Sequence, residues 1–441
     1  MKRNWLRFMA LTMGIPLLIA MLVACGAGTT TTGTGTSTTQ GSTIIKVATD
    51  FPVSGADAGI GKSTENGAHL AVDEANTNHV IPGYTLQFDP QDDVGASGVH
   101  DPTKGANNMK ALVGDALVAG VVGPLNSNVA QAEMPIANQA PLAMISPANT
   151  NPCLTKEGAD VGCTGANDLV PKLRPTGKVT YFRVAATDDH QGPAMADYLY
   201  NTLHLRTAYV IDDTETYGAG LAKYFVQEWT KLGGTVIDGK SHSVKSTTSY
   251  LNLLTAAAAS KPDVIYFGGN YSTGGQLIQQ QMMTIPALKN AVFAGGDGLT
   301  GSSDFYKQIV TSGGKAYMTV AAPDVSKIPA AQTFIKNYTA KYGDVGPYSA
   351  AAYDAMNILI QAIKVALTKT HTPKDSSDAA QAQVFRQAVI DALKTITYNG
   401  ITGKISFDQN GDTTNKIFTV YQVANVNGKP DLVAKEVVTV Q

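Results

Sequence analysis

From Ile44 onward, short apolar runs alternate with longer amphipathic segments along the chain. The short runs are bounded by turn residues, which is typical of buried strands. They lie at 44–51, 86–88, 116–123, 142–146, 208–212, 263–267, 291–294 and 316–321. The longer segments carry apolar residues at helical spacing and are predicted to be helices. They lie at 61–75, 103–113, 128–139, 191–202, 218–232, 251–259, 275–283 and 330–342.

Strands and helices in turn predict parallel β-sheets with helices on both faces. The predicted strands are more numerous than one sheet holds comfortably, and the alternation pauses at 149–179, a loop rich in glycine and proline. We therefore predict an α/β fold with two Rossmann-like lobes, each built on a parallel-sheet core.

The N-terminal segment has a different pattern. Residues 1–24 begin with basic side chains and no acid, and then become apolar, which is the pattern of an export signal. A permanent anchor helix is the alternative, but Gly14 and Pro16 interrupt the apolar run, and a spanning helix needs roughly 20 apolar residues. The segment 22–25 (LVAC) resembles the bacterial lipobox, in which cleavage precedes a cysteine that becomes lipidated. We expect a lipoprotein signal peptide at 1–24 and a lipid on Cys25.

The segment that follows Cys25 is almost entirely threonine, glycine and serine up to residue 43. Such a composition buries too little apolar surface to offset the entropy of ordering, so a flexible tether is expected at 25–43. Its average reach is roughly 24 Å. The folded body is thus expected at the outer face of the cytoplasmic membrane, in the cell envelope, held there by lipid.

Composition and charge exclude several classes of partner. The 441 residues contain 33 basic and 35 acidic side chains, for a formal charge of −2, so no basic excess exists to attract nucleic acid. The three cysteines are too few to build the fold. Cys153 and Cys163 lie in the 149–179 loop, and outside the cytoplasm they are expected to form a disulfide. Two free thiols are the alternative.

Patterns of catalysis and metal binding are missing from the sequence. The seven histidines show no ligand spacing with one another or with cysteine, so no metal is expected. The segment 56–63 (ADAGIGKS) departs from a phosphate-binding loop because Ala56 occupies the first glycine position. We expect a protein that is not an enzyme and carries no cofactor.

Two polar turns follow neighbouring predicted strands in 122–150 (VGPLNSNVAQAEMPIANQAPLAMISPANT). Ser127 lies at the start of a helix, where free amides favour a carboxylate, and Thr150 offers a hydroxyl from the adjacent turn. Open α/β sheets bind ligands at this edge. Ordinary helix capping and turn chemistry would also explain each loop taken alone.

This segment resembles the ligand-binding turns of the branched-chain amino-acid (leucine/isoleucine/valine) binding proteins of ABC importers. Four further motifs continue the resemblance in the family's order, at 189–193 (DHQGP), 216–220 (TYGAG), 266–269 (YFGG) and 295–298 (GGDG). It covers nearly all of 44–425 and implies the type I periplasmic-binding-protein fold, in which three crossovers join the lobes. We place these near Ala186, Ala321 and Phe418. The implied lobes are 44–186 plus 322–417, and 187–321 plus 418–441.

The resemblance also implies roles for individual residues. Ser127 and Thr150 would bind an α-carboxylate, while Thr150 and the Ala148 carbonyl would take part of the α-ammonium. Tyr217 would close over the ligand from the second lobe, and Asp297 would neutralise the ammonium. The complete expected site comprises Ser127, Ala148, Asn149, Thr150, Tyr217, Asn270, Tyr271, Asp297 and Tyr348.

Several positions depart from the family pattern. Asp297 stands where the leucine-type proteins carry Glu, and Ile60 stands where an aromatic residue is common. Asn270 takes a Tyr position, with Tyr271 beside it, and His190 replaces an acid. These departures leave the identity of the ligand's side chain open.

The resemblance implies an extracytoplasmic solute-binding protein. It would capture an amino acid, branched-chain or similar, between two lobes and deliver it as a monomer to the permease subunits of an ABC importer. The alternatives are the same fold binding an amide, urea or an aromatic acid, or acting as a sensory receptor without transport.

Overall fold

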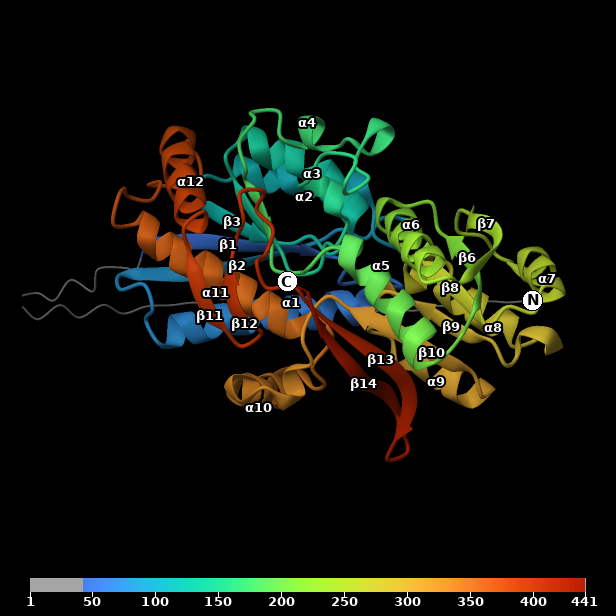
Figure 1. Cartoon of the computed structure of the whole chain (residues 1–441). Coiled ribbons are helices and arrows are strands. Elements are labelled where there is room, and N and C mark those ends of the chain that lie inside the picture. The colour runs from blue at the N-terminus through green and yellow to red at the C-terminus, as the bar shows by residue number, and fades with distance from the viewer. Residues whose placement is uncertain (1–42, 441) are drawn as a thin grey trace, which may run out of the picture. The chain divides into compact units, whose positions relative to one another are not determined.

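The computed structural model describes residues 43–440 (Figure 1). The predicted signal peptide, the lipid site at Cys25 and almost all of the tether lie outside these residues. Within them, no helix is both long enough and apolar enough to cross a membrane.

One lobe is built on a five-stranded sheet in the order β2-β1-β3-β4-β5, and every pair in it is parallel. Its strands are β1 (Thr43–Phe51), β2 (Tyr84–Asp92), β3 (Val118–Val122), β4 (Ala143–Ser146) and β5 (Tyr181–Arg183). Successive side chains of a strand point to opposite faces, so Ile145 packs in one core and Met144 in the other. The helices of these two cores are α1 (Ala58–Thr77), α11 (Ser349–Ala366) and α12 (Ala379–Leu393) on one face, and α2 (Pro102–Gly114) and α3 (Ser127–Gln139) on the other.

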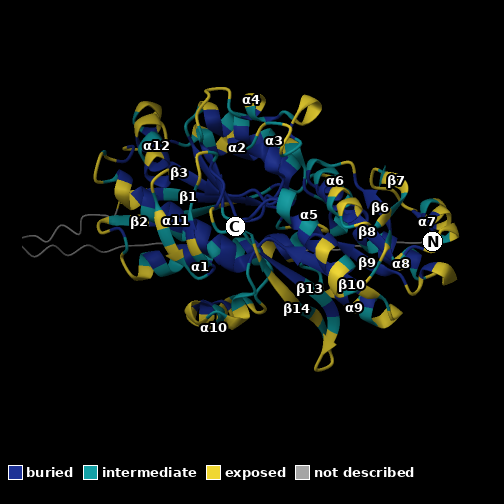
Figure 2. Cartoon of the chain, viewed as in Figure 1, coloured by how far each residue is buried: buried dark blue, intermediate teal, exposed yellow. Residues whose placement is uncertain are grey.

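The second lobe is built on a seven-stranded sheet in the order β14-β13-β10-β9-β8-β6-β7, in which β13 and β14 are antiparallel. Its strands are β6 (Thr207–Asp212), β7 (Thr235–Ser243), β8 (Val264–Gly268), β9 (Val292–Gly295), β10 (Lys315–Val320), β13 (Ile417–Val426) and β14 (Lys429–Thr439). Helices α5 (Asp188–Asp197) and α6 (Thr216–Lys231) cover one face, and α7 (Leu251–Ala259), α8 (Gln276–Met282) and α9 (Ser303–Ser312) cover the other. Figure 2 shows the central strands of both sheets in the dark blue of buried residues, whereas the edge strands β7 and β14 carry many exposed residues.

Short elements complete the described chain. They are η1 (Pro152–Leu154), η2 (Gly165–Asn167), α4 (Val170–Leu173), η3 (Tyr198–Thr202), η4 (Tyr271–Gly275), η5 (Pro286–Leu288), η6 (Asp297–Leu299), η7 (Val325–Lys327), η8 (Pro329–Ala331), α10 (Gln332–Tyr342), β11 (Thr397–Gly400) and β12 (Gly403–Ser406). Of these, η1 directly follows the turn that carries Thr150, and η6 begins at Asp297.

The chain passes between the two sheets after β5, after β10 and before β13. Residues from these segments pack together in one buried cluster that contains Ala185, Ala186, Ala321 and Phe418. The three alanines leave room for the crossing segments to lie close to one another, and the Phe418 ring packs against them.

The predicted fold class is confirmed, since two parallel-sheet cores carry helices on both faces. The predicted strands and helices all appear, with ends that differ by a few residues. The apolar pattern did not single out α9, α11, α12 or the β13–β14 hairpin. Helix α11 is buried on most of its surface, so its sequence lacks the polar face by which an amphipathic helix is identified.

Arg183, at the end of β5, is fully buried and holds several segments together. Its Nε donates to Asp412 Oδ1 at 2.7 Å. Its Nη1 donates to the carbonyls of Asn149 at 3.2 Å and Asn151 at 2.7 Å, and its Nη2 donates to the Thr155 hydroxyl. A single guanidinium therefore fixes the turn after β4 and ties it to the segment that leads into β13.

Replacing Arg183 by methionine leaves the buried Asp412 carboxylate without its hydrogen-bonded guanidinium, and Lys156 Nζ, 3.9 Å from Asp412 Oδ2, is then its remaining cation in the described residues. We expect Arg183→Met to lower the free energy of unfolding by about 3–5 kcal/mol, measured by urea denaturation. The double variant Arg183→Met/Asp412→Leu removes both charges and is expected to lose less than the single variant. A single variant within about 1 kcal/mol of the wild type would contradict this role.

Candidate functional site

The two polar turns predicted to bind ligand lie side by side at the ends of β3 and β4. Asn149 joins them, because its Nδ2 donates to the Leu125 carbonyl at 2.7 Å and its Oδ1 accepts from the Tyr181 hydroxyl at 2.8 Å. Ser127 is buried at the first position of α3, and Thr150 is buried in the second turn. Asn149 was expected among the ligand contacts, but its carboxamide is used to hold the turns together.

Asp297 is the acidic residue that the second lobe supplies to the candidate site. Its Oδ1 accepts from Gln191 Nε2 at 2.6 Å and from the Tyr217 hydroxyl at 3.0 Å. Burial raises the pKa of Asp297, and these two hydrogen bonds lower it only in part. The expected pair Tyr217 and Asp297 is therefore brought together.

Asp188 is a candidate site residue that the sequence analysis did not single out. It begins α5 and is fully buried, and its carboxylate forms no ion pair within the described residues, although the nearby Thr150 hydroxyl lowers its pKa in part. Burial and the nearby Asp297 carboxylate raise the pKa of Asp188 well above its usual range. The backbone amide of Asp188 donates to the Thr150 carbonyl at 2.8 Å, which places this acid beside the first lobe's turn.

Other buried polar atoms in this region also lack partners among residues 43–440. They are the Thr150 hydroxyl, Gln191 Oε1 and the Tyr266 hydroxyl. Native interiors rarely leave such atoms unsatisfied unless a ligand, ion or water takes the place of the partner. The acids and hydroxyls at the junction of the lobes are therefore the candidate polar binding site.

Tyr348 lies at the start of α11 and is fully buried. Its hydroxyl accepts from the Ala321 amide at 3.3 Å, and burial together with the Asp297 charge raises the pKa of the phenol well above its usual range. Tyr348 thus links a helix of the first lobe to a crossover segment and to the acidic centre.

A cavity of about 340 Å³ lies next to this polar site. Ile60, Leu125 and Asn126 line it from the first lobe. Asn270, Tyr271 and Gly298 line it from the second. Asn126 directly precedes Ser127, and Gly298 directly follows Asp297, so the cavity opens beside the expected contacts of the ligand's charged groups. A volume of this size suits a small molecule.

The lobes also meet directly around the site. Asn151 Nδ2 donates to the Thr216 carbonyl at 2.5 Å, and the Thr216 hydroxyl donates to Gln131 Oε1 at 3.0 Å. A smaller cavity of about 230 Å³ lies beside these contacts. The start of α6 is therefore held against the first lobe.

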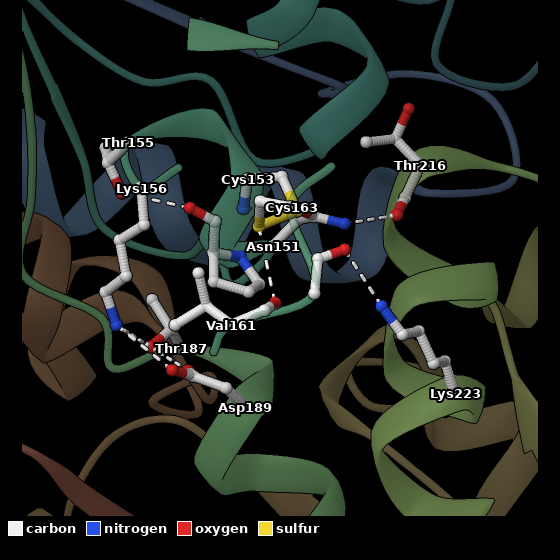
Figure 3. Close-up of a disulfide and its surroundings, with 12 residues drawn as sticks. Asn151, Cys153, Thr155, Lys156, Val161, Cys163, Thr187, Asp189, Thr216 and Lys223 are labelled. Carbon is white, nitrogen blue, oxygen red and sulfur yellow. Dashed lines mark hydrogen bonds and ion pairs between the residues drawn. A yellow bond between two sulfur atoms is a disulfide. The ribbon is translucent and has the colours of Figure 1, made fainter. Parts of the chain in front are cut away.

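The predicted disulfide between Cys153 and Cys163 is confirmed (Figure 3). The loop that it closes contacts α6, because the Gly162 carbonyl accepts from Lys223 Nζ at 3.0 Å and the Val161 carbonyl accepts from the Tyr224 hydroxyl at 2.5 Å. The disulfide thus restrains a loop of the first lobe that forms part of the contact between the lobes.

Lys156, in the same loop, donates to Asp189 Oδ2 at 3.1 Å at the start of α5 (Figure 3). Asp189 and Asp188 are neighbours in the sequence but differ in their surroundings, since Asp189 forms an ion pair with Lys156, whereas Asp188 forms none in the described residues and feels only the nearby charge of Arg183. Asp188 is therefore the better candidate for contact with a ligand.

His100 forms a charged bridge between the lobes. Its Nδ1 lies 2.8 Å from Asp57 Oδ2 in the first lobe, and its Nε2 lies 2.9 Å from Glu215 Oε2 in the second. Burial alone would lower the pKa of His100, but its hydrogen bonds to the two carboxylates raise it to about 10. The imidazolium therefore links the lobes at neutral pH. Among residues 43–440, no group of three or more His, Cys, Asp or Glu side chains is arranged to hold a metal.

Comparisons with known proteins agree with this architecture. A family model described as "Periplasmic binding protein" matches residues 44–429. The Leu/Ile/Val-binding protein BraC3 of Rhizobium johnstonii is 28% identical over 371 residues, covering 84% of this chain and 89% of that protein. The leucine-specific-binding protein of Salmonella typhimurium is 27% identical over 386 residues, covering 86% and 90%.

Solved structures extend the similarity to three dimensions. The leucine binding protein LivK of Thermotoga maritima has a TM-score of 0.71 and 25% identity, covering 89% of this chain and 98% of that one. The substrate binding protein LivJ of Streptococcus pneumoniae, solved in complex with isoleucine, has a TM-score of 0.69 and 24% identity, covering 90% and 99%.

The His100 bridge makes stability depend on pH. A pKa raised in the folded state gives stability that is complete below the unfolded value of about 6.5 and is lost as pH rises through 10. We expect the difference in unfolding free energy between the wild type and His100→Gln to shrink between pH 6 and pH 10, as measured by urea denaturation. His371→Gln, at an exposed position, is the control. A difference that does not change with pH would show that His100 is not charged in the bridge.

Proposed function

Because the chain belongs to the periplasmic binding protein family, we propose that it captures an amino acid between its two lobes and delivers it to the permease of an ABC importer. Membership of this family also confirms the resemblance drawn from the sequence motifs. The relatives compared above are named as proteins that bind amino acids. We propose that this chain likewise binds its ligand without catalysing a reaction.

The buried acids at the junction of the lobes carry the proposal. Asp297 and Asp188 are both buried, and neither forms an ion pair within the described residues. A ligand ammonium placed between them, with the Thr150 hydroxyl, would restore their ionised forms, since a nearby cation lowers a carboxyl pKa. The Ala148 carbonyl would accept a further hydrogen bond from the same ammonium.

The α-carboxylate of the ligand would then lie against the start of α3. The first amides of a helix have no acceptor within the helix and carry partial positive charge. With the Ser127 hydroxyl and the Thr150 amide they would form an anion site a short distance from the acids. An aromatic acid, an amide or urea lacks the ammonium, so it would leave the two acids unpaired, and an amino acid matches the site better.

We further propose that the protein works by closing around its ligand. The ligand would bind the first lobe, and closure would add Tyr217 and Asp297 from the second. The buried cluster at the crossovers is placed to serve as the hinge. The lobes would then be 44–186 plus 322–417, and 187–321 plus 418–441.

The location of the protein follows from its N-terminal sequence. We propose that residues 1–24 direct export, that Cys25 carries the lipid, and that 25–43 tether a monomer to the outer face of the cytoplasmic membrane. This arrangement would keep a binding protein close to the permease that receives its ligand, whereas a sensory receptor would need a different partner.

Removing the charge of Asp297 tests the amino-acid assignment. We expect Asp297→Asn to weaken amino-acid binding by about 2–5 kcal/mol, because a buried ammonium would lose a charged partner. Isothermal titration calorimetry over the standard amino acids supplies the affinities. Asp375→Asn, which removes an exposed acid that lines neither cavity, is the matched control and is expected to bind as the wild type does. Unchanged affinity in Asp297→Asn would favour a ligand without an amine.

The carboxylate anchor is tested by Ser127→Ala. Since Ser127 would contact a group that all amino acids share, every ligand that binds the wild type is expected to lose a similar affinity, about 1.5–3 kcal/mol. The measurement compares dissociation constants across several amino acids. Loss for one side chain and not for others would contradict the anchor role.

A further inference from the structure

The two lobes meet backbone to backbone at two glycines on the rim of the larger cavity. Gly59, in the first turn of α1, and Gly301, in the turn before α9, both line this cavity. A Cβ built on Gly59 would lie 2.1 Å from the Gly301 carbonyl oxygen, and one built on Gly301 would lie 2.6 Å from the Ile60 Cβ. Glycine at both positions therefore allows an approach of the two backbones that side chains would prevent.

The turn of the second lobe that makes this contact also carries Asp297. Asp297 lies four residues before Gly301 in the sequence. The Thr300 hydroxyl donates to the Asp297 carbonyl at 2.6 Å, and the Gly301 amide donates to the Tyr306 hydroxyl at 2.7 Å. These bonds hold the turn as one unit, so the place of Gly301 against the first lobe also sets the place of Asp297.

The start of α1 is held equally firmly in the first lobe. Ile60 packs in the core of that lobe, and the Gly59 carbonyl accepts from the Ser63 hydroxyl at 2.9 Å. Asp57, which directly precedes α1, is bonded to His100 at 2.8 Å. A side chain at position 59 would meet a backbone carbonyl, and backbone held on both sides cannot turn away as the end of a flexible side chain can.

The two glycines differ in their own backbone conformation. Gly301 has a φ of +86°, which favours glycine whether or not the other lobe is near. Gly59 lies within a helix, a conformation that alanine adopts more readily than glycine. Folding of α1 therefore does not require glycine at position 59, whereas the approach of the second lobe does. A substitution at Gly59 thus separates closure of the lobes from folding.

We propose that Gly59 is a positioning residue for closure of the lobes. Its missing side chain lets the Gly301 carbonyl reach α1, and this contact brings Asp297 to its place in the closed site. A methyl group at position 59 would hold the turn back by about 1 Å before ordinary van der Waals contact is restored. The inference rests on the proposed function, because apparent affinity falls with the population of the closed form that binds.

Isothermal titration calorimetry of Gly59→Ala with the standard amino acids tests the proposal. We expect every amino acid that binds the wild type to bind this variant at least about tenfold more weakly. Its Tm is expected to equal or exceed that of the wild type, because alanine favours a helix. Gly114→Ala is the matched control, since Gly114 also lies in a helix and a Cβ there would meet nothing within 4 Å. It is expected to bind as the wild type does.

The distance between the lobes supplies a second readout. Nitroxide labels, attached through noncanonical amino acids, replace the exposed Lys110 in the first lobe and Lys289 in the second. Double electron–electron resonance is expected to show a shorter distance in the wild type when an amino acid is bound. Gly59→Ala is expected to keep the distance of the ligand-free protein at the same amino-acid concentration.

The outcomes separate this inference from the proposed function. Gly59→Ala that binds amino acids as tightly as the wild type, or that closes to the same distance, would overturn the inference and leave the proposed function standing. Weakening of large amino acids alone would show that the methyl group fills the cavity, and would also overturn it. Failure of every amino acid to bind the wild type would overturn both. Equal weakening of all amino acids, with loss of the shorter distance, would support the inference.

Discussion

The buried ion pair between Arg183 and Asp412 is the interaction on which the binding region depends. A buried guanidinium must be paired and hydrogen-bonded, and Arg183 meets this requirement with one carboxylate, two carbonyls and one hydroxyl. These partners belong to the turn after β4 and to the segment before β13. The same turn carries Thr150, whose carbonyl accepts from the amide of Asp188. Arg183 thus holds the turn that follows β4 in the first lobe, and this turn in turn contacts the start of α5 in the second lobe.

Burying polar groups between two apolar cores costs free energy unless those groups form hydrogen bonds or ion pairs. The molecule satisfies part of this requirement internally, through the His100 bridge between Asp57 and Glu215 and through the disulfide-closed loop against α6. The remaining part is concentrated at Asp188, Thr150 and the neighbouring hydroxyls. Such a division separates contacts that hold the lobes together from contacts left for a ligand.

The sequence predicted much of the fold because its signals are local. Apolar runs and amphipathic segments depend on spacing within one element, so strands and helices followed from them, and the disulfide followed from two cysteines in one loop. The surroundings of Asp188 and the hydrogen bonds of the Asn149 side chain could not be predicted in this way. Asp188 and Asp189 look alike in sequence, and only packing gives a lysine to one and none to the other. The carboxamide of Asn149 joins two turns, which no local pattern records.

By itself, then, the sequence determined the alternation of strands and helices and the turns that carry Ser127 and Thr150. Only the tertiary structure decided which polar groups at those turns have partners and which do not. The reason is that burial and hydrogen bonding depend on residues far apart in the chain, such as Arg183 with Asp412 and Gln191 with Asp297. Whether a carboxyl is paired or left for a ligand is settled by what packs around it.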